Sequence, residues 1–218
     1  MISGRFCLLN ESQAGDSDAM PWPDESVVKR VLSSRGRSAI LRSAVAESWV
    51  TTVKEYPQRA WWRRKGTHAS VMWEHSVQNA ITALSEDDGC KPVPHDDTLS
   101  FVFDQLVLVR FKKADIELKS RNYPTFLASL FHAHEEELPG FEDLHRVEAA
   151  YVLNPLQTNI EWIGIVARHK KQVLWQFDLN PASNVVQLPL PERTQTAAEK
   201  VMRAKPDRSI DQENESQK

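Results

Sequence analysis

The stretch from Thr98 to Lys113, TLSFVFDQLVLVRFKK, constrains the fold more than any other part of the chain. It is dominated by valine, leucine and phenylalanine, which favour extended backbone. Asp104 and Gln105 interrupt the apolar run from Phe101 to Val109, and short polar residues between two such runs are typical of a hairpin turn. The stretch therefore predicts two antiparallel strands, which need further strands or a helix to bury their apolar side chains.

Three later stretches, VEAAYVL, IEWIGIVA and QVLWQFDL, supply the further strands. The last alternates cleanly, because Val173, Trp175 and Phe177 fall on one face and polar residues fall largely on the other. RHKK, at 168–171, is a plausible tight turn between the last two stretches. Together with the hairpin, these stretches predict a sheet of about five strands.

The first half of the chain is helical in its pattern. SAILRSAVAESWVTTV repeats apolar residues every four positions and is followed by Pro57. THASVMWEHSVQNAITAL predicts a second helix, with a core face formed by Trp73, Val77, Ile81 and Leu84 and with His68, Met72, His75 and Asn79 on the opposite, outer side. Pro124 can open a third helix, PTFLASLFHAHEEEL, between the hairpin and the later strands. We expect an α+β fold: N-terminal helices packed on a mostly antiparallel sheet, with one crossover helix.

The two ends are polar and rich in turn-forming residues. We expect residues 1–23 and 190–218 to be disordered tails, because neither offers enough apolar surface to offset the entropy of ordering, and residues 24–189 to form a single domain. Cys7 and Cys90 cannot form a disulfide framework, and the opening residues lack the apolar run of a signal peptide or membrane anchor. These features predict a cytoplasmic protein.

The net charge of −3 argues against a protein that coats nucleic acid generally, but the charges are unevenly distributed. Between Glu25 and Lys65 ten cations stand against three anions, so the remainder of the chain is acidic. We expect one basic and one acidic side of the molecule.

The seven histidines invite a metal site, but their spacing is unfavourable. On a helix His132 and His134 point to nearly opposite faces, and the position of His134 in line with apolar residues favours a satisfied core histidine. His68 and His75 share a helix face but lie roughly 10 Å apart along its axis, too far for one zinc ion. We predict no metal and no cofactor, although a single carboxylate-bound Mg²⁺ site would leave little trace in a sequence.

Cations and histidines mark a candidate site. We expect a phosphate-containing ligand to be bound by the cations at the end of the second hairpin strand and by those before the second helix, because the former precede a helix start that favours anions and the latter follow two tryptophans that can stack on bases. His75 and His68 are the candidate acids or bases. The predicted binding residues are Arg110, Lys112, Lys113, Arg121, Asn122, Arg63 and Arg64. Solvation of a strand end explains the first cluster about as well.

Two hydrolase patterns fit poorly. Asp104 followed by Glu117 and Lys119 matches the metal-dependent PD-(D/E)xK nuclease pattern loosely, but Asp104 is expected in a turn and Glu117 beyond the strand. The chain has no Gly-x-Ser-x-Gly motif for nucleophilic hydrolysis.

Residues 60–180 resemble a family of small bacterial proteins. The motifs that carry the resemblance are RRKGTHASVMWEHSVQNA, FVFDQLVLVRFKKADIELKSRNYPTF, ELPGF and the final AAYVLNPLQTNIEWIGIVARHKKQVLWQFDL. Members are encoded beside a helix-turn-helix partner with an ImmA/IrrE-type metallopeptidase-like domain, an arrangement similar to a toxin-antitoxin pair and to the Rosmer phage-defence system. This chain departs from the pattern at Gly66, Thr67 and His68, where the family tends to have Thr-Arg before Ala-Ser.

The resemblance implies a toxin-like effector of a toxin-antitoxin or phage-defence pair, acting on a phosphate-containing or nucleic-acid target, with the helix-turn-helix protein as its antitoxin-like partner. It implies no catalytic residues. The alternative is a non-enzymatic binding or regulatory module that recognises nucleic acid or the partner protein. The sequence leaves open whether any reaction is catalysed.

Overall fold

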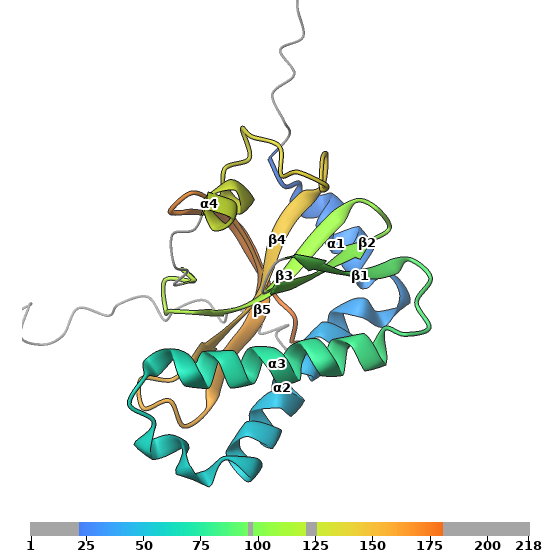
Figure 1. Cartoon of the computed structure of the whole chain (residues 1–218). Helices are drawn as coiled ribbons and strands as arrows, with labels where there is room; N and C mark the ends of the chain where they lie inside the picture. The colour runs from blue at the N-terminus through green and yellow to red at the C-terminus, as the bar shows by residue number, and fades with distance from the viewer. Residues whose placement is uncertain (1–21, 96–97, 121–125, 181–218) are drawn as a thin grey trace, which may run out of the picture. The chain divides into compact units, whose positions relative to one another are not determined.

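The predicted α+β architecture is confirmed in the computed structural model of the chain, which describes residues 22–95, 98–120 and 126–180. Three N-terminal helices cover one face of a six-stranded, mostly antiparallel sheet, and one short helix lies on the other face (Figure 1). The sheet has one strand more than the sequence predicts.

The three N-terminal helices are α1 (Glu25–Ser33), α2 (Arg37–Glu55) and α3 (Lys65–Ala83). The side chain of Asp24 caps α1, because its Oδ1 accepts hydrogen bonds from the backbone N–H groups of Ser26 at 2.7 Å and Val27 at 3.1 Å. Short 3-10 turns, Ser34–Gly36 and Pro57–Trp61, connect the helices. The two helices predicted for this half of the chain are confirmed, and α2 ends just before Pro57 as expected.

The strands follow one another in the sheet in their chain order, β1 to β6. They are β1 (Cys90–His95), β2 (Thr98–Phe103), β3 (Val107–Ala114), β4 (His145–Leu153), β5 (Ile160–His169) and β6 (Gln172–Asp178). All neighbours are antiparallel except β3 and β4, which are parallel and are joined across the sheet by α4 (Phe126–His132). The sequence analysis missed β1 because it contains Pro92 and Pro94, which are tolerated only at a sheet edge such as this one.

The hairpin between β2 and β3 turns where the sequence predicts. Asp104 and Gln105 both have positive φ, 49° and 54°, and the backbone N–H of Leu106 donates to the carbonyl of Phe103 at 2.9 Å. Positive φ at both central residues matches the right-handed twist of the flanking strands. The turn sets the register, so that alternate residues of β3 face the N-terminal helices and α4.

The larger core lies between the sheet and α1 to α3. Its buried members on the sheet come from every second position of β2 to β5, and α2 and α3 contribute the facing side chains. The fully buried aromatic residues of this core are Phe101, Phe103 and Phe111. A smaller apolar group lies on the other face, where α4 packs, and consists of Leu108, Leu130, Phe131, Leu138 and Phe141.

The predicted outer side of α3 is wrong. His68 and Met72 are buried, and the side-chain amide of Asn79 donates to the carbonyl of Ala44 in α2 at 3.2 Å. The reason is that α3 packs against both the sheet and α2, so that two sides of the helix are covered. A single apolar stripe identifies only one of them.

The helix α4 is shorter than predicted. It ends at His132, so His134 lies in the turn that follows, and Pro124, the predicted first residue, is outside the described residues. The predicted turn between β5 and β6 is confirmed at Lys170, whose φ is 52°.

The described N-terminal residues contact the far strands of the sheet. The ring of Trp22 stacks on His169 with centroids 5.1 Å apart, and the indole N–H of Trp175 donates to the carbonyl of Pro23 at 2.6 Å. The expected tails fall mainly in 1–21 and 181–218, outside the described residues, and remain predictions. No helix within the described ranges is long and apolar enough to cross a membrane.

Candidate functional site

The cations predicted at the end of β3 are divided between its two faces. Arg110 lies on the α4 side, 8% exposed, with its guanidinium carbon 4.4 Å from the centre of the Phe131 ring. Its Nη2 is 3.5 Å from the hydroxyl of Thr98, at the outer limit of a hydrogen bond. The charge is therefore placed against an aromatic face rather than against a carboxylate.

Lys112 lies on the same side as Arg110, two positions further along β3. Burial lowers the pKa of both side chains, and Glu148 opposes this effect through its charge. Among the described residues neither cation forms an ion pair, because Glu148 is engaged with other groups. Within the described residues, buried Arg110 and half-buried Lys112 thus lack a carboxylate partner of their own.

Glu148, on β4, is the buried carboxylate of this side, with 1% of its surface exposed. Its oxygens accept a hydrogen bond from the Ser120 hydroxyl at 2.9 Å and lie 3.3 Å from Nε2 of His132 and 3.5 Å from Nη1 of Arg168. Burial raises the pKa of Glu148, but these three partners outweigh it and hold the pKa below its ordinary value. The carboxylate is ionised and already satisfied.

Two more buried groups complete the α4 side. Arg146 donates to the carbonyls of Leu130 at 2.7 Å and of two residues just after α4, so it is held by the end of that helix. Nε2 of His134 is 2.8 Å from the carbonyl of Arg168, and burial lowers the pKa of His134 to about 4. The prediction of a satisfied core histidine is confirmed for His134.

Lys113 lies on the opposite face of β3. It is the cross-strand neighbour of Tyr151 on β4, and its Nζ is 3.2 Å from Oε1 of Gln157 in the loop after β4. Next to it a cleft of about 330 Å³ opens between α3 and the last residues of β3. The cleft is lined by Ala69, Ser70, Trp73, Glu74, Ser76, Thr98, Phe111, Lys112, Lys113 and Tyr151.

The two candidate catalytic histidines lie beside this cleft but do not line it. His68 is buried edge-on against Trp49, with ring centres 5.4 Å apart, and its two ring nitrogens have no hydrogen-bond partner in the described structure. Burial, followed by the charges of Lys113 and Arg59, lowers the pKa of His68 to about 4. His75 packs near Tyr56, with ring centres 6.0 Å apart. The sheet separates both from Arg110, so the expected single pocket containing histidines and Arg110 is not formed.

The remaining predicted binding residues are placed in part. Arg63 and Arg64 are exposed just before α3, beside Trp61, whose side chain is 84% exposed. This basic segment leads directly into α3, whose residues Ala69 and Ser70 line the cleft. Arg121 and Asn122 are outside the described residues.

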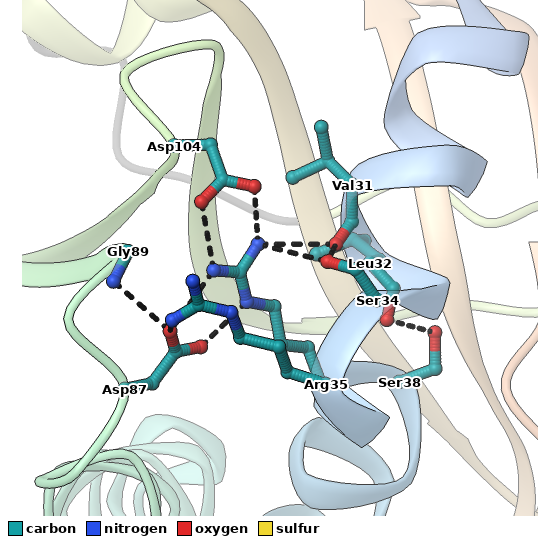
Figure 2. Close-up of polar contacts among 9 residues, drawn as sticks. Val31, Leu32, Ser34, Arg35, Ser38, Asp87, Gly89 and Asp104 are labelled. Atoms are coloured by element: carbon teal, nitrogen blue, oxygen red, sulfur yellow. Dashed lines mark hydrogen bonds and ion pairs between the residues drawn. The ribbon is translucent and has the colours of Figure 1, made fainter.

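A further charged cluster, centred on Arg37, was missed by sequence reasoning. Its guanidinium is fully buried and donates to Asp87 at 2.6 Å and to Asp104 at 2.6 and 2.8 Å, while Arg35 also pairs with Asp87 (Figure 2). Any side chain at Gly89 would collide with Asp104 and Arg37. The cluster ties the start of α2 to the β2–β3 turn, which is a structural role. A basic residue among many others gave no signal of it.

This cluster also bears on the nuclease pattern. Asp104 is occupied by Arg37, and Glu117 pairs with Lys119 in an exposed loop. Among the described residues no three histidine, cysteine, aspartate or glutamate side chains are grouped closely enough to hold a metal ion. The three residues of that pattern therefore do not meet in one site.

Comparison of the chain with protein-family models, with curated proteins and with solved structures gave no match.

Proposed function

We propose that this protein is a toxin-like effector of a bacterial toxin-antitoxin or phage-defence pair and acts on a phosphate-containing or nucleic-acid target. The partner would be the helix-turn-helix protein with an ImmA/IrrE-type domain that the resemblance implies. The genetic setting comes from that resemblance, and the ligand class comes from the charges around β3.

The observation that carries the ligand class is the surplus of buried positive charge on the α4 side. Arg110 is buried and Lys112 is half-buried, yet the buried carboxylate that the described residues place nearby is engaged with Ser120, His132 and Arg168. A buried charge without a partner is costly, and an anionic ligand offsets that cost. Phosphate is the anion best suited to lysine and arginine donors.

A nucleic-acid target is supported by the segment before α3. Trp61 is exposed beside Arg63 and Arg64, and an exposed indole next to cations can stack on a base while the cations hold phosphates. The segment leads directly into α3, whose residues Ala69 and Ser70 line the cleft beside Lys113. One polynucleotide could therefore contact this segment and Lys113.

A non-enzymatic binding or regulatory module is the second candidate, and the state of His68 favours it. Burial and neighbouring cations lower its pKa to about 4, so at neutral pH its imidazole is uncharged, which makes it a poor general acid and a weak base. An effector of this kind would act by occupying nucleic acid or its partner rather than by cleaving a bond.

The test combines toxicity and binding in the full chain. The protein is expressed with and without the neighbouring gene product, and binding of fluorescent single-stranded RNA and DNA is titrated at several salt concentrations. Arg110→Met and Lys112→Met should each weaken binding about tenfold or more and lower the salt dependence by about one counterion. Arg42→Met, on the solvated face of α2, is the matched control.

Thermal melts accompany each variant, because Arg110 is buried against Phe131. If Arg110→Met and Lys112→Met fold and retain full binding and toxicity, the cations only end a strand and the ligand proposal is wrong. If the wild type is harmless alone, with and without phage, the toxin assignment is wrong, and retained binding would then favour the regulatory module.

A further inference from the structure

The hydroxyl of Tyr151 is the least explained polar atom near the cleft between α3 and β3. Tyr151 is 3% exposed and belongs to the larger core, yet its hydroxyl has no hydrogen-bond partner among the described residues. Burial raises its pKa, so the hydroxyl keeps its proton and can donate. A phenylalanine would provide the same apolar contacts without a buried polar atom.

The residues around Tyr151 suit an anionic acceptor for its buried hydroxyl. Tyr151 lines the cleft, and its cross-strand neighbour Lys113 brings a positive charge to the same wall. Ser70 and Thr98 also line the cleft, but their hydroxyl groups already donate to the carbonyls of Gly66 and His95. The Tyr151 hydroxyl and the Lys113 charge on one wall suit an anion with oxygen acceptors.

The other walls of the cleft suit a flat apolar group. Trp73 from α3 and Phe111 from β3 border it, and its volume of about 330 Å³ is within the range of small-molecule sites. Glu74, the one carboxylate of the lining, limits the negative charge that the cleft accepts. A ligand with one phosphate and one aromatic base meets these conditions better than a triphosphate does.

We infer that this cleft binds a single nucleotide unit, with the Tyr151 hydroxyl donating to its phosphate, Lys113 pairing with the phosphate charge, and the base lying against Trp73. The inference rests on the proposed function and deepens it, because it names the part of the target that enters the fold. The unit is either a free mononucleotide or the terminal nucleotide of a strand, and both present the same chemistry.

The test is Tyr151→Phe in the full chain, with Tyr56→Phe, which lies outside the cleft lining, as the matched control. The probes are adenosine and uridine 5′-monophosphate, measured by calorimetry, and a short single-stranded RNA with and without a 5′-phosphate. Losing a hydrogen bond to a charged group should weaken binding of at least one phosphorylated probe about tenfold or more. The melting temperature without ligand should stay the same or rise, since a buried unpaired hydroxyl is removed.

The outcomes separate the two proposals. Weaker binding of the mononucleotides supports a free nucleotide, and weaker binding of the 5′-phosphorylated RNA alone supports a strand end. If Tyr151→Phe binds every probe as the wild type does while Arg110→Met, which lies outside the cleft lining, loses RNA binding, the nucleotide cleft is wrong and the proposed function stands. If neither variant changes binding of any probe, both proposals fail.

Discussion

Buried arginines on the two faces of the sheet differ in whether they have carboxylate partners. On the face covered by α1 to α3, Arg37 is held by Asp87 and Asp104, two carboxylates for one guanidinium. On the α4 face, buried Arg110 and half-buried Lys112 form no ion pair with a described residue, and Arg146 is held by backbone carbonyls. The buried carboxylate there, Glu148, lies 3.5 Å from Arg168. The first arrangement neutralises its charge internally, and the second does not.

The difference distinguishes a structural ion cluster from a candidate binding site. A guanidinium with two carboxylate partners has no capacity left for a ligand, whereas buried cations that outnumber their carboxylates create a positive potential in a low-dielectric region. Removing Glu148 should therefore harm folding, and removing Arg110 or Lys112 should mainly harm binding. Three sets of variants test, through protein stability, whether buried charges are paired differently on the two faces.

The largest effect is expected from Glu148→Leu. It leaves Arg168 and His132 buried without their anion and adds to the uncompensated positive charge, so the free energy of unfolding should fall by about 3–5 kcal/mol. Urea denaturation measures it, with Glu117→Leu in the exposed loop as control. A loss below about 1 kcal/mol would mean that Glu148 does not neutralise the α4 side.

A smaller effect is expected from Arg37→Met, about 2–3 kcal/mol at neutral pH, because Asp104 is partly exposed and Asp87 keeps Arg35. The effect should depend on pH. Hydrogen bonding to Arg37 lowers the pKa of Asp87 to about 2 and also lowers that of Asp104, while both lie near 3.9 in the unfolded chain.

A carboxyl group whose pKa is lower in the folded chain than in the unfolded chain stabilises the fold at any pH above its unfolded pKa. That stabilisation is lost as the pH falls through its folded pKa. The wild type should therefore lose stability from about pH 5 towards pH 2, and Arg37→Met should lose less over that range. Urea midpoints across the range test this. Parallel curves for the two proteins would show that the Arg37 cluster does not set these pKa values.

The smallest changes in stability are expected from replacing two buried histidines, one on each face of the sheet. His68→Phe removes two ring nitrogens without partners and should change stability by less than about 1 kcal/mol at pH 7. His134→Phe leaves the carbonyl of Arg168 without its side-chain donor and should cost about 1–2 kcal/mol. Thermal unfolding of the two variants compares them directly.

The same two variants should flatten the acid side of the stability curve. Burial lowers the pKa of both imidazoles to about 4, against about 6.5 unfolded, so their contribution is complete above pH 6.5 and is lost as pH falls to 4. In each variant, the loss of stability between pH 6.5 and pH 4 should be smaller by the contribution of the histidine that was replaced. An unchanged slope between these values in both would contradict neutral, buried rings.

Local sequence patterns predicted the elements well where the chain's own neighbours decide the backbone. The four-residue repeat of α2 is confirmed, as is the turn at Asp104 and Gln105, because apolar spacing and turn chemistry act over a few residues. The edge strand β1 was not predicted, because Pro92 and Pro94 argue against a strand unless that strand is known to lie at the edge of a sheet.

For the candidate site, the sequence predicted the kinds of residue but not which of them lie together. The alternation along β3 implies that Arg110 and Lys113 face opposite sides, but which side carries histidines depends on where α3 and α4 pack. Because α3 is covered by both α2 and the sheet, His68 became a core residue rather than an exposed acid or base. One stripe of apolar residues on a helix does not reveal that a second side of the helix is also buried.

Short-range spacing and composition were enough to predict the α+β class, two of the three N-terminal helices, the central hairpin and the cations at the end of β3, but not α1. Only the tertiary structure decided which charges are paired. Arg37 meets Asp87 and Asp104 across 50 and 67 positions of the chain, while Arg110 is placed against Phe131 and away from a free carboxylate. Electrostatic pairing depends on distance in space and on burial, and neither is encoded in the spacing of residues along the chain.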